Sequence, residues 1–214
     1  GEIMFIKSYC RITNHSIVLD GQRQETLGKF LNGHHVSEDL DNVFEQLDAD
    51  YPAFFGMDEF SKLGFITAEL LMRHNGYDTE TFKPDMGVVI HSRSGTLGAD
   101  YHLLRVMDGL SDDTQAYKRT IPNAICADIA CRFKLGGEMG LILADGFVYE
   151  HFFRTSYGMF STDPDLKTLL SGYVECYGGY MSALLCLLER SQQPVEKDYD
   201  LMEERFCIDL LRIH

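Results

Sequence analysis

Short continuous apolar runs alternate with segments of helical spacing along much of the chain. Residues 3–19 are rich in β-branched and aromatic residues and end at the turn signal Asp20-Gly21, so they predict a first strand or a hairpin. Residues 57–75 carry an apolar stripe at helical spacing, can be capped by Asp58 or Ser61, and stop at Asn75-Gly76. This segment is the clearest helix in the sequence.

Two runs, 86–91 and 139–143, are apolar without interruption, which is typical of strands buried on both faces of a covered, partly parallel sheet. After the first run, residues 92–98 resemble a glycine-containing connection from a strand to a helix. They match neither GxGxxG nor the Walker pattern, so the sequence predicts no phosphate site in this loop.

The remaining segments complete the expected order of elements. We expect a polar, irregular chain over 20–52, helices near 99–110, over 122–133, 148–157 and 164–171, a strand, turn and strand over 173–188, and an amphipathic element within 196–214. Helices that alternate with buried strands predict one α/β domain over residues 1–214, with helices on both faces of the sheet.

Charge and composition exclude several classes of protein. Lys and Arg number 19 against 33 Asp and Glu, a formal charge of −14, whereas nucleic-acid binding depends on a basic surface. No stretch approaches the roughly 20 apolar residues that cross a bilayer, and the first residues lack a signal-peptide layout. We therefore expect neither nucleic acid nor membrane as a partner.

Cysteine and histidine usage predicts neither a disulfide framework nor a metal centre. The six cysteines lie in apolar surroundings without a CxxC pair, which is typical of reduced thiols in a cytoplasmic protein. His34 and His35 are adjacent, so their side chains diverge, and no further ligands are spaced near them. We expect no metal and no other cofactor.

Four segments, in order, resemble the amino-terminal half of β-ketoacyl synthases of the thiolase-like superfamily. They are the Met-Asp helix start in 55–64, the strand and glycine loop of 86–98, the Ile-Pro-Asn helix and Gly-Gly turn of 121–137, and the strand ending in paired glycines, 171–179. The chain is also similar to short ketosynthase-like proteins of aryl-polyene and flexirubin pathways. The resemblance implies a thiolase-like half with a mixed, mostly parallel five-stranded sheet and helices on both faces.

The nucleophile of this family is missing from its expected place. In working synthases the strand after the turn ends in Thr-Ala-Cys, and the helix start that follows stabilises the thiolate. Here the cysteine's place falls on Gly146, and no cysteine occurs between Cys131 and Cys176. The two histidines that condensing enzymes take from a second half-domain have no room before His214. The resemblance therefore implies a non-catalytic chain, with no catalytic residue assigned.

A vestigial pocket is expected around the lost nucleophile. Asp145 and Gly146 would line it. His91, at the end of a buried strand, and His151, five residues after Gly146, could border it, although core or surface histidines are the commoner case. A Ser92, His91 and aspartate constellation is a further alternative, with nothing in the sequence to fix its geometry.

The resemblance implies a subunit that dimerises with itself or with a complete ketosynthase, in a chain-length or scaffold role in fatty acid, polyketide or aryl-polyene synthesis. Family dimers pair the strand before the nucleophile, which places Leu141, Ile142 and Leu143 at the interface. One alternative is a small module that binds an acyl chain or acyl carrier protein. The acidic charge would repel such a carrier, and the compact basic candidates are Lys118, Arg119, Arg132 and Lys134. Another is a minimal acyltransferase or hydrolase that uses Ser92, Ser94 or a cysteine of 126–131.

Overall fold

A single mixed sheet organises the molecule. The computed structural model describes residues 3–95, 97, 100, 104–105, 107–109, 123–192 and 205–208. Within these residues, seven strands form one sheet in the order β3-β2-β1-β7-β6-β4-β5. The strands are β1 (Met4–Thr13), β2 (Ile17–Leu19), β3 (Gln22–Arg23), β4 (Met86–Ser92), β5 (Met139–Leu143), β6 (Thr168–Tyr177) and β7 (Tyr180–Arg190).

The expectation of five mostly parallel strands was wrong. Four neighbouring pairs are antiparallel (β1–β2, β2–β3, β1–β7 and β6–β7), and two are parallel (β4–β5 and β4–β6). Tight hairpins explain three of the antiparallel pairs, β1–β2, β2–β3 and β6–β7. In the last, Gly178 and Gly179 take positive φ angles of 62° and 84°, as a type I′ hairpin loop requires. Strands β1 and β7 are far apart in the sequence, so no hairpin joins that pair. Helical crossovers make the parallel pairs, because a parallel neighbour cannot be reached by a short turn.

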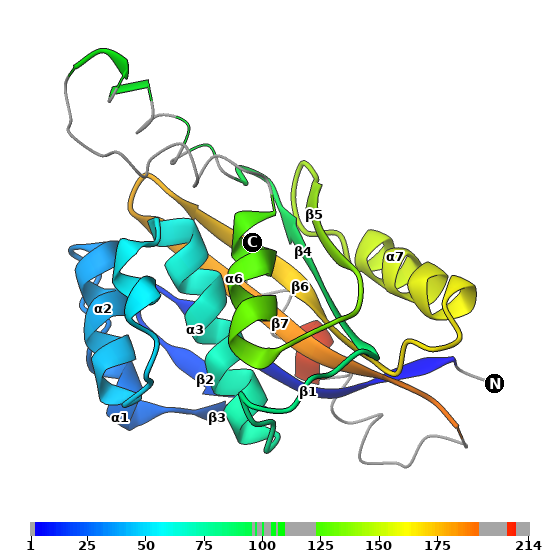
Figure 1. The fold of residues 1–214 in the computed structure, drawn as a ribbon. Coiled ribbons are helices and arrows are strands. Elements are labelled where there is room, and N and C mark those ends of the chain that lie inside the picture. The colour runs from blue at the N-terminus through cyan, green and yellow to red at the C-terminus, as the bar shows by residue number, and fades with distance from the viewer. Residues whose placement is uncertain are drawn as a thin grey trace.

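Helices cover both faces of the sheet, as the sequence predicts (Figure 1). They are α1 (Glu25–Gly28), α2 (Val36–Gln46), the 3-10 helix η1 (Pro52–Gly56), α3 (Glu59–His74), α6 (Ala124–Phe133) and α7 (Tyr149–Thr162). Helices α2, α3 and α6 share one hydrophobic core with one face of the sheet. Helix α7 and Phe206, from the short helical segment 205–208, share the core on the opposite face.

Helix α3 confirms the expected helix over 57–75. The side chain of Asp58 accepts a hydrogen bond from the backbone N–H of Ser61, which satisfies one of the free donors of the first turn. The helix is buried along most of its length, and its Glu69 carboxylate is fully buried between Arg73 and Arg132. This ion-pair cluster joins α3 to α6.

Two expectations about local structure were wrong. The region 20–52 is not irregular, because it contains α1 and α2; the buried positions of α2 include Val36, Leu40, Val43 and Phe44, which lie on one helical face. The helix expected over 164–171 is instead a turn followed by the start of β6. Leu169 and Leu170 are buried on this central strand, where the apolar run is as compatible with a strand as with a helix.

The other expected elements agree with the structure where it describes them. The first hairpin, both buried strands and the strand, turn and strand over 173–188 are confirmed, and the helix near 148–157 extends to Thr162. Three parts of the expected elements lie outside the described residues. They are most of the helix near 99–110, Pro122 at the start of the helix over 122–133, and the tail apart from 205–208. None of the described helices is long and apolar enough to cross a bilayer.

Candidate functional site

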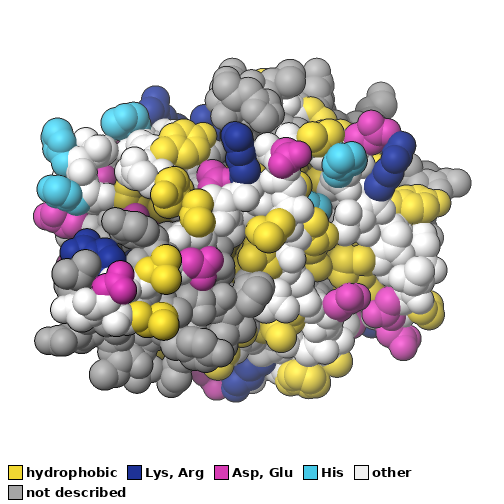
Figure 2. All heavy atoms as spheres, turned by 90° about the horizontal axis from the view of Figure 1, so that it is seen from above, with side chains coloured by type: hydrophobic (Ala, Val, Ile, Leu, Met, Phe, Trp, Pro, Cys, Tyr) yellow, Lys and Arg dark blue, Asp and Glu magenta, His cyan; other side chains and the backbone are white. Residues whose placement is uncertain are grey.

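A cavity of about 620 Å³ lies at the carboxyl ends of the parallel strands β4, β5 and β6. Ligands of open α/β sheets bind at this end of the strands. The loop after β5 contributes Asp145, Gly146 and Phe147, and β6 contributes Tyr173 and Glu175. Figure 2 looks down on this end of the molecule, where hydrophobic side chains lie among scattered acidic, basic and histidine side chains.

The carboxylate of Glu175 fixes one wall of the cavity. It accepts hydrogen bonds from the backbone N–H groups of Arg93 and Ser94, at 3.0 and 3.2 Å, from the Ser94 hydroxyl, and from the Tyr173 hydroxyl at 2.9 Å. Only 8% of Glu175 is exposed. Burial raises the pKa of Tyr173, and the hydrogen bond to Glu175 raises it further, so this hydroxyl keeps its proton. The loop after β4 is thus tied to β6.

Sequence reasoning missed Glu175. A detectable signal was present, because a carboxylate stands inside the apolar run of β6, where charged residues are rarely buried without partners.

His91 is buried beside the cavity but does not line it. The imidazole packs edge-on against Phe147 and Phe152, with ring centroids 6.3 and 6.0 Å away, and is 3% exposed. Its Nε2 atom is buried and has no hydrogen-bond partner among the described residues. Burial, with a smaller contribution from His151, lowers the pKa of His91 to about 4, so the ring is neutral near neutral pH.

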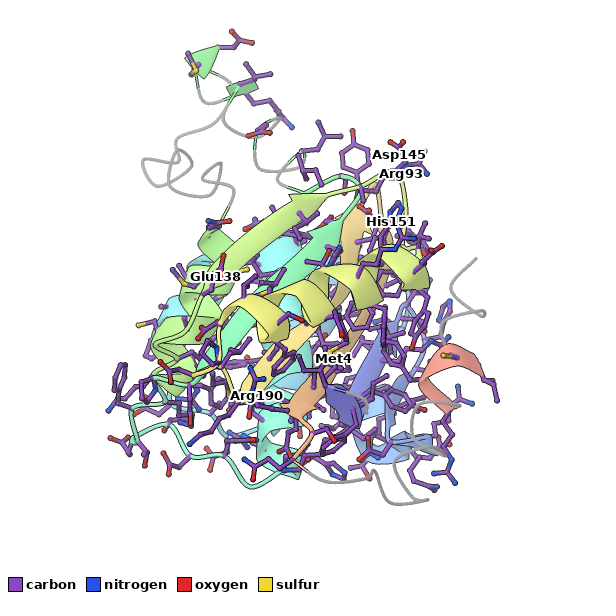
Figure 3. The ribbon with its side chains drawn as sticks, turned by 90° about the vertical axis from the view of Figure 1, so that its right-hand side faces the viewer. Met4, Arg93, Glu138, Asp145, His151 and Arg190 are labelled. Atoms are coloured by element: carbon purple, nitrogen blue, oxygen red, sulfur yellow. The ribbon has the colours of Figure 1, made fainter. Side chains whose placement is uncertain are left out.

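The structure gathers part of the expected pocket. Asp145 and Gly146 line the cavity, His91 lies behind its Phe147 wall, and His151 is exposed on the first turn of α7. Figure 3 shows Arg93, Asp145 and His151 at the same end of the sheet.

The loop from β5 to α7 carries no thiol. It reads Ala-Asp-Gly-Phe-Val over 144–148, and a Cβ atom added at Gly146 would meet nothing within 4 Å. Cys126 lies under the sheet on α6, where its thiol donates to the carbonyl of Gly140 at 3.3 Å and burial raises its pKa to about 12. Burial also raises the pKa of Cys176. Neither buried thiol is poised as a thiolate.

The serine constellation is not assembled. Ser92 and His91 are consecutive strand residues, so their side chains lie on opposite faces of the sheet. The Ser92 hydroxyl is fully buried and accepts a hydrogen bond from the backbone N–H of Gly95 at 2.9 Å. The hydroxyl of Ser94 is held by Glu175.

Strand β5 forms one edge of the sheet, and its only strand partner among the described residues is β4 (Figure 1). Its Met139 and Leu143 side chains are 43% and 68% exposed. The backbone N–H of Leu141 donates to the Asn123 side chain at 3.0 Å, while that of Ala144 bonds Ser92 of β4 at 2.9 Å. Residue alternation therefore directs the Leu141 and Leu143 amides away from β4.

The other candidate residues are engaged elsewhere. His34 and His35 line a separate cavity beside the start of α2, and the described residues contain no cluster of metal-ligating side chains. Arg132 pairs with Glu69 through two nitrogens, at 3.0 and 2.9 Å, and Lys134 contacts Glu80. Lys118 and Arg119 lie outside the described residues.

Comparison with known proteins identifies the fold. No protein-family model matches the chain, and no curated protein matches it in sequence. Among solved structures it is similar to the ishigamide ketosynthase/chain length factor, with a TM-score of 0.65 and 14% identity over 91% of this chain and 64% of that one. It is also similar to a ketosynthase in complex with its chain length factor from Xenorhabdus doucetiae (TM-score 0.57, 14% identity, 89% of this chain and 80% of that one).

A β-ketoacyl synthase from Burkholderia phymatum gives a TM-score of 0.60 at 14% identity over 90% of this chain. The chain spans 60% of the length of that synthase. The molecule therefore has the thiolase-like fold of ketosynthases, as the sequence resemblance implies.

Proposed function

We propose that this protein is a non-catalytic subunit of carbon-chain assembly, which partners a complete ketosynthase in fatty acid, polyketide or aryl-polyene synthesis. The observation that supports this proposal most strongly is the amino-acid sequence of the loop from β5 to α7. Synthases that the chain resembles place their cysteine there at a helix start, whereas this loop offers Asp145 and Gly146.

The charge of the loop supports the same conclusion. A helix start stabilises a thiolate, but an adjacent carboxylate raises the pKa of a thiol and opposes its ionisation. Asp145 stands where the synthases have the alanine of Thr-Ala-Cys. Two residues of the motif, rather than one, thus depart from what acyl transfer requires.

A labelling experiment tests the loss of the nucleophile. Wild-type protein, Gly146→Cys and the double variant Asp145→Ala/Gly146→Cys would be incubated with cerulenin and analysed by mass spectrometry. We expect no adduct on the wild type and faster labelling of the double variant than of the single one, because removing Asp145 lowers the thiol pKa. A wild-type adduct on Ser94 or on a cysteine would contradict the proposal and favour the minimal acyltransferase.

The exposed edge of β5 supports assembly with a partner. Among the described residues β5 has no second strand partner, and an edge strand is a template for another strand. The Leu141 N–H is bonded to Asn123, but the exposed apolar side chains of Met139 and Leu143 favour burial against a second chain. Two of the similar solved structures are described as ketosynthases with a chain length factor. We propose that Leu141, Ile142 and Leu143 form the contact with the complete ketosynthase, the homodimer being the alternative assembly.

The cavity beside Gly146 supports a chain-length role. Its lining mixes aromatic and apolar side chains with polar and charged ones, and the part formed by Leu97, Phe147 and the tyrosines suits the end of a growing acyl chain. Because space is open at Gly146, Gly146→Leu would narrow the cavity without a backbone clash. In a reconstituted reaction we expect the wild type to change the product lengths made by the ketosynthase, and Gly146→Leu to shorten them. Gly158→Leu, on α7 with equally open space, is the control. Identical products with and without the protein would refute the role.

The same cavity favours a second candidate function, a module that binds an acyl chain without a ketosynthase. Native mass spectrometry of the purified protein distinguishes the two. A lipid that remains bound to the isolated wild type and is lost in Gly146→Leu would favour the binding module.

A further inference from the structure

A second cavity lies on the α7 face of the sheet, at the hairpin end rather than at the strand ends described above. Strands β1, β2 and β3 form its floor, and the segment 205–208 forms its rim. Figure 3 shows this segment, in red, beside the blue strands of the hairpin. The cavity has a volume of about 550 Å³.

Three arginines from separate elements line this cavity. Arg11 comes from β1, Arg23 from β3 and Arg205 from the rim, and no carboxylate is among the described lining residues. Like charges that converge with no carboxylate in the described lining repel one another, and such a group is unexpected in a chain of formal charge −14. An anionic ligand would remove the repulsion.

The guanidinium groups have few partners in the described part of the chain. The Nε atom of Arg11 is buried and has no hydrogen-bond partner there. Arg23 lies 3.8 Å from Glu25, and both side chains are largely exposed, so water screens this pair. Arg205 donates to the backbone carbonyl of Asp20 at 3.3 Å.

The nearest carboxylate of the hairpin, that of Asp20, is engaged outside this cavity. It accepts hydrogen bonds from the Ser8 hydroxyl and the backbone N–H of Tyr9, and it contacts the His74 ring of α3 at 2.9 Å. Helix α3 packs on the opposite face of the sheet, so Asp20 does not line the arginine cavity.

The remaining wall adds neutral polar groups and a fixed turn. Gly21 takes a φ of +79°, and a Cβ atom there would lie 3.4 Å from the Arg205 Cδ and 3.6 Å from the Tyr9 hydroxyl. Ser16 and Gln22 also line the cavity. Guanidinium forks bind phosphate oxygens through paired, charge-assisted hydrogen bonds.

We propose that this arginine cavity binds the phosphate group of a small organic phosphate, a site separate from the proposed ketosynthase-like function. The cavity is much larger than one phosphate group, so the organic part of the ligand lies against Tyr9, Val18 and Ile208. Phosphate monoesters and diphosphates are the ligand class that this combination of charge and volume fits.

Calorimetric titration with inorganic phosphate and with pyrophosphate, at constant ionic strength with chloride, tests the site. We expect saturable binding of one pyrophosphate per chain, tighter than that of phosphate. Arg11→Gln and Arg205→Gln would each weaken it at least about tenfold, the loss expected for one charge-assisted contact. Arg154→Gln, an exposed α7 arginine paired with Glu150 at 2.6 Å, is the matched control.

Circular dichroism checks that each variant folds, and Arg205→Glu gives a second test at an exposed position. Absence of saturable pyrophosphate binding to the wild type would overturn the proposal. Binding that Arg205→Glu and Arg11→Gln leave unchanged, or that Arg154→Gln weakens equally, would overturn it as well.

Discussion

The buried His91 imidazole makes the stability of the protein depend on pH in a defined window. Burial lowers its pKa to about 4 in the folded state, whereas an unfolded histidine titrates near about 6.5. Between these values the unfolded chain binds a proton that the native chain does not. The free energy of unfolding is therefore fully retained above the unfolded pKa and falls as the pH drops towards the folded one.

The magnitude follows from the two pKa values. The full loss is about 3 kcal/mol, and about 2 kcal/mol of it falls between about pH 7 and about pH 5. His91→Leu would remove this loss, because leucine has a similar size and suits the contacts with Phe147 and Phe152. It also removes a buried nitrogen that has no partner among the described residues, so we expect little destabilisation at neutral pH.

Urea unfolding of the wild type and His91→Leu, at several pH values in this range, measures the difference directly. Other titrating groups are common to both proteins and cancel in the comparison. His151→Gln is a further control, because His151 contributes less to the lowered pKa than burial does. Parallel stability curves for the wild type and His91→Leu would refute the assignment of a neutral, buried imidazole.

Three further substitutions test the framework of the fold by urea unfolding. Glu69→Leu leaves the Arg132 guanidinium without its paired contact, so we expect the free energy of unfolding to fall by about 3 to 5 kcal/mol. A fall below about 1 kcal/mol would contradict the role of this ion-pair cluster. Gly172→Ala would place a Cβ against the backbone carbonyl of Leu184 on β7, so we expect failure to fold or a loss above about 3 kcal/mol. Gly158→Ala, where nothing lies within 4 Å, should instead add about 0.5 to 1 kcal/mol; a similar effect of the two alanines would refute the packing argument.

Long, strongly patterned segments were predictable from the sequence. Helix α3 and the buried strands β4 and β5 follow from apolar spacing and from turn residues at their ends. Helix α2 was not predicted, because its apolar positions are few and its polar residues suggested a loop. Its buried face nevertheless has helical spacing. The start of β6 was assigned to a helix because local pattern cannot separate a buried strand from a buried helix, and the tertiary pairing with β4 and β7 decides.

The strand directions could not be read from single segments. The antiparallel majority arises because β2 and β3 extend the sheet beyond β1 and because β7 lies between β1 and β6. Asp145 and Gly146, which we expect from the sequence to border a vestigial pocket, line the cavity. The sequence did not reveal that Phe147 separates His91 from that cavity, or that Glu175 ties the loop after β4, since both facts depend on which strands are neighbours.

Assembly through β5 can be measured by light scattering of the protein mixed with the complete ketosynthase encoded nearest to it. We predict a stable mixed complex that Leu143→Glu abolishes, because this substitution places a charge in the proposed apolar contact. Phe55→Glu, an exposed aromatic on the 3-10 helix η1, should leave the complex intact. A wild-type protein that remains a monomer beside the ketosynthase, or a complex that Leu143→Glu does not affect, would contradict assembly through β5.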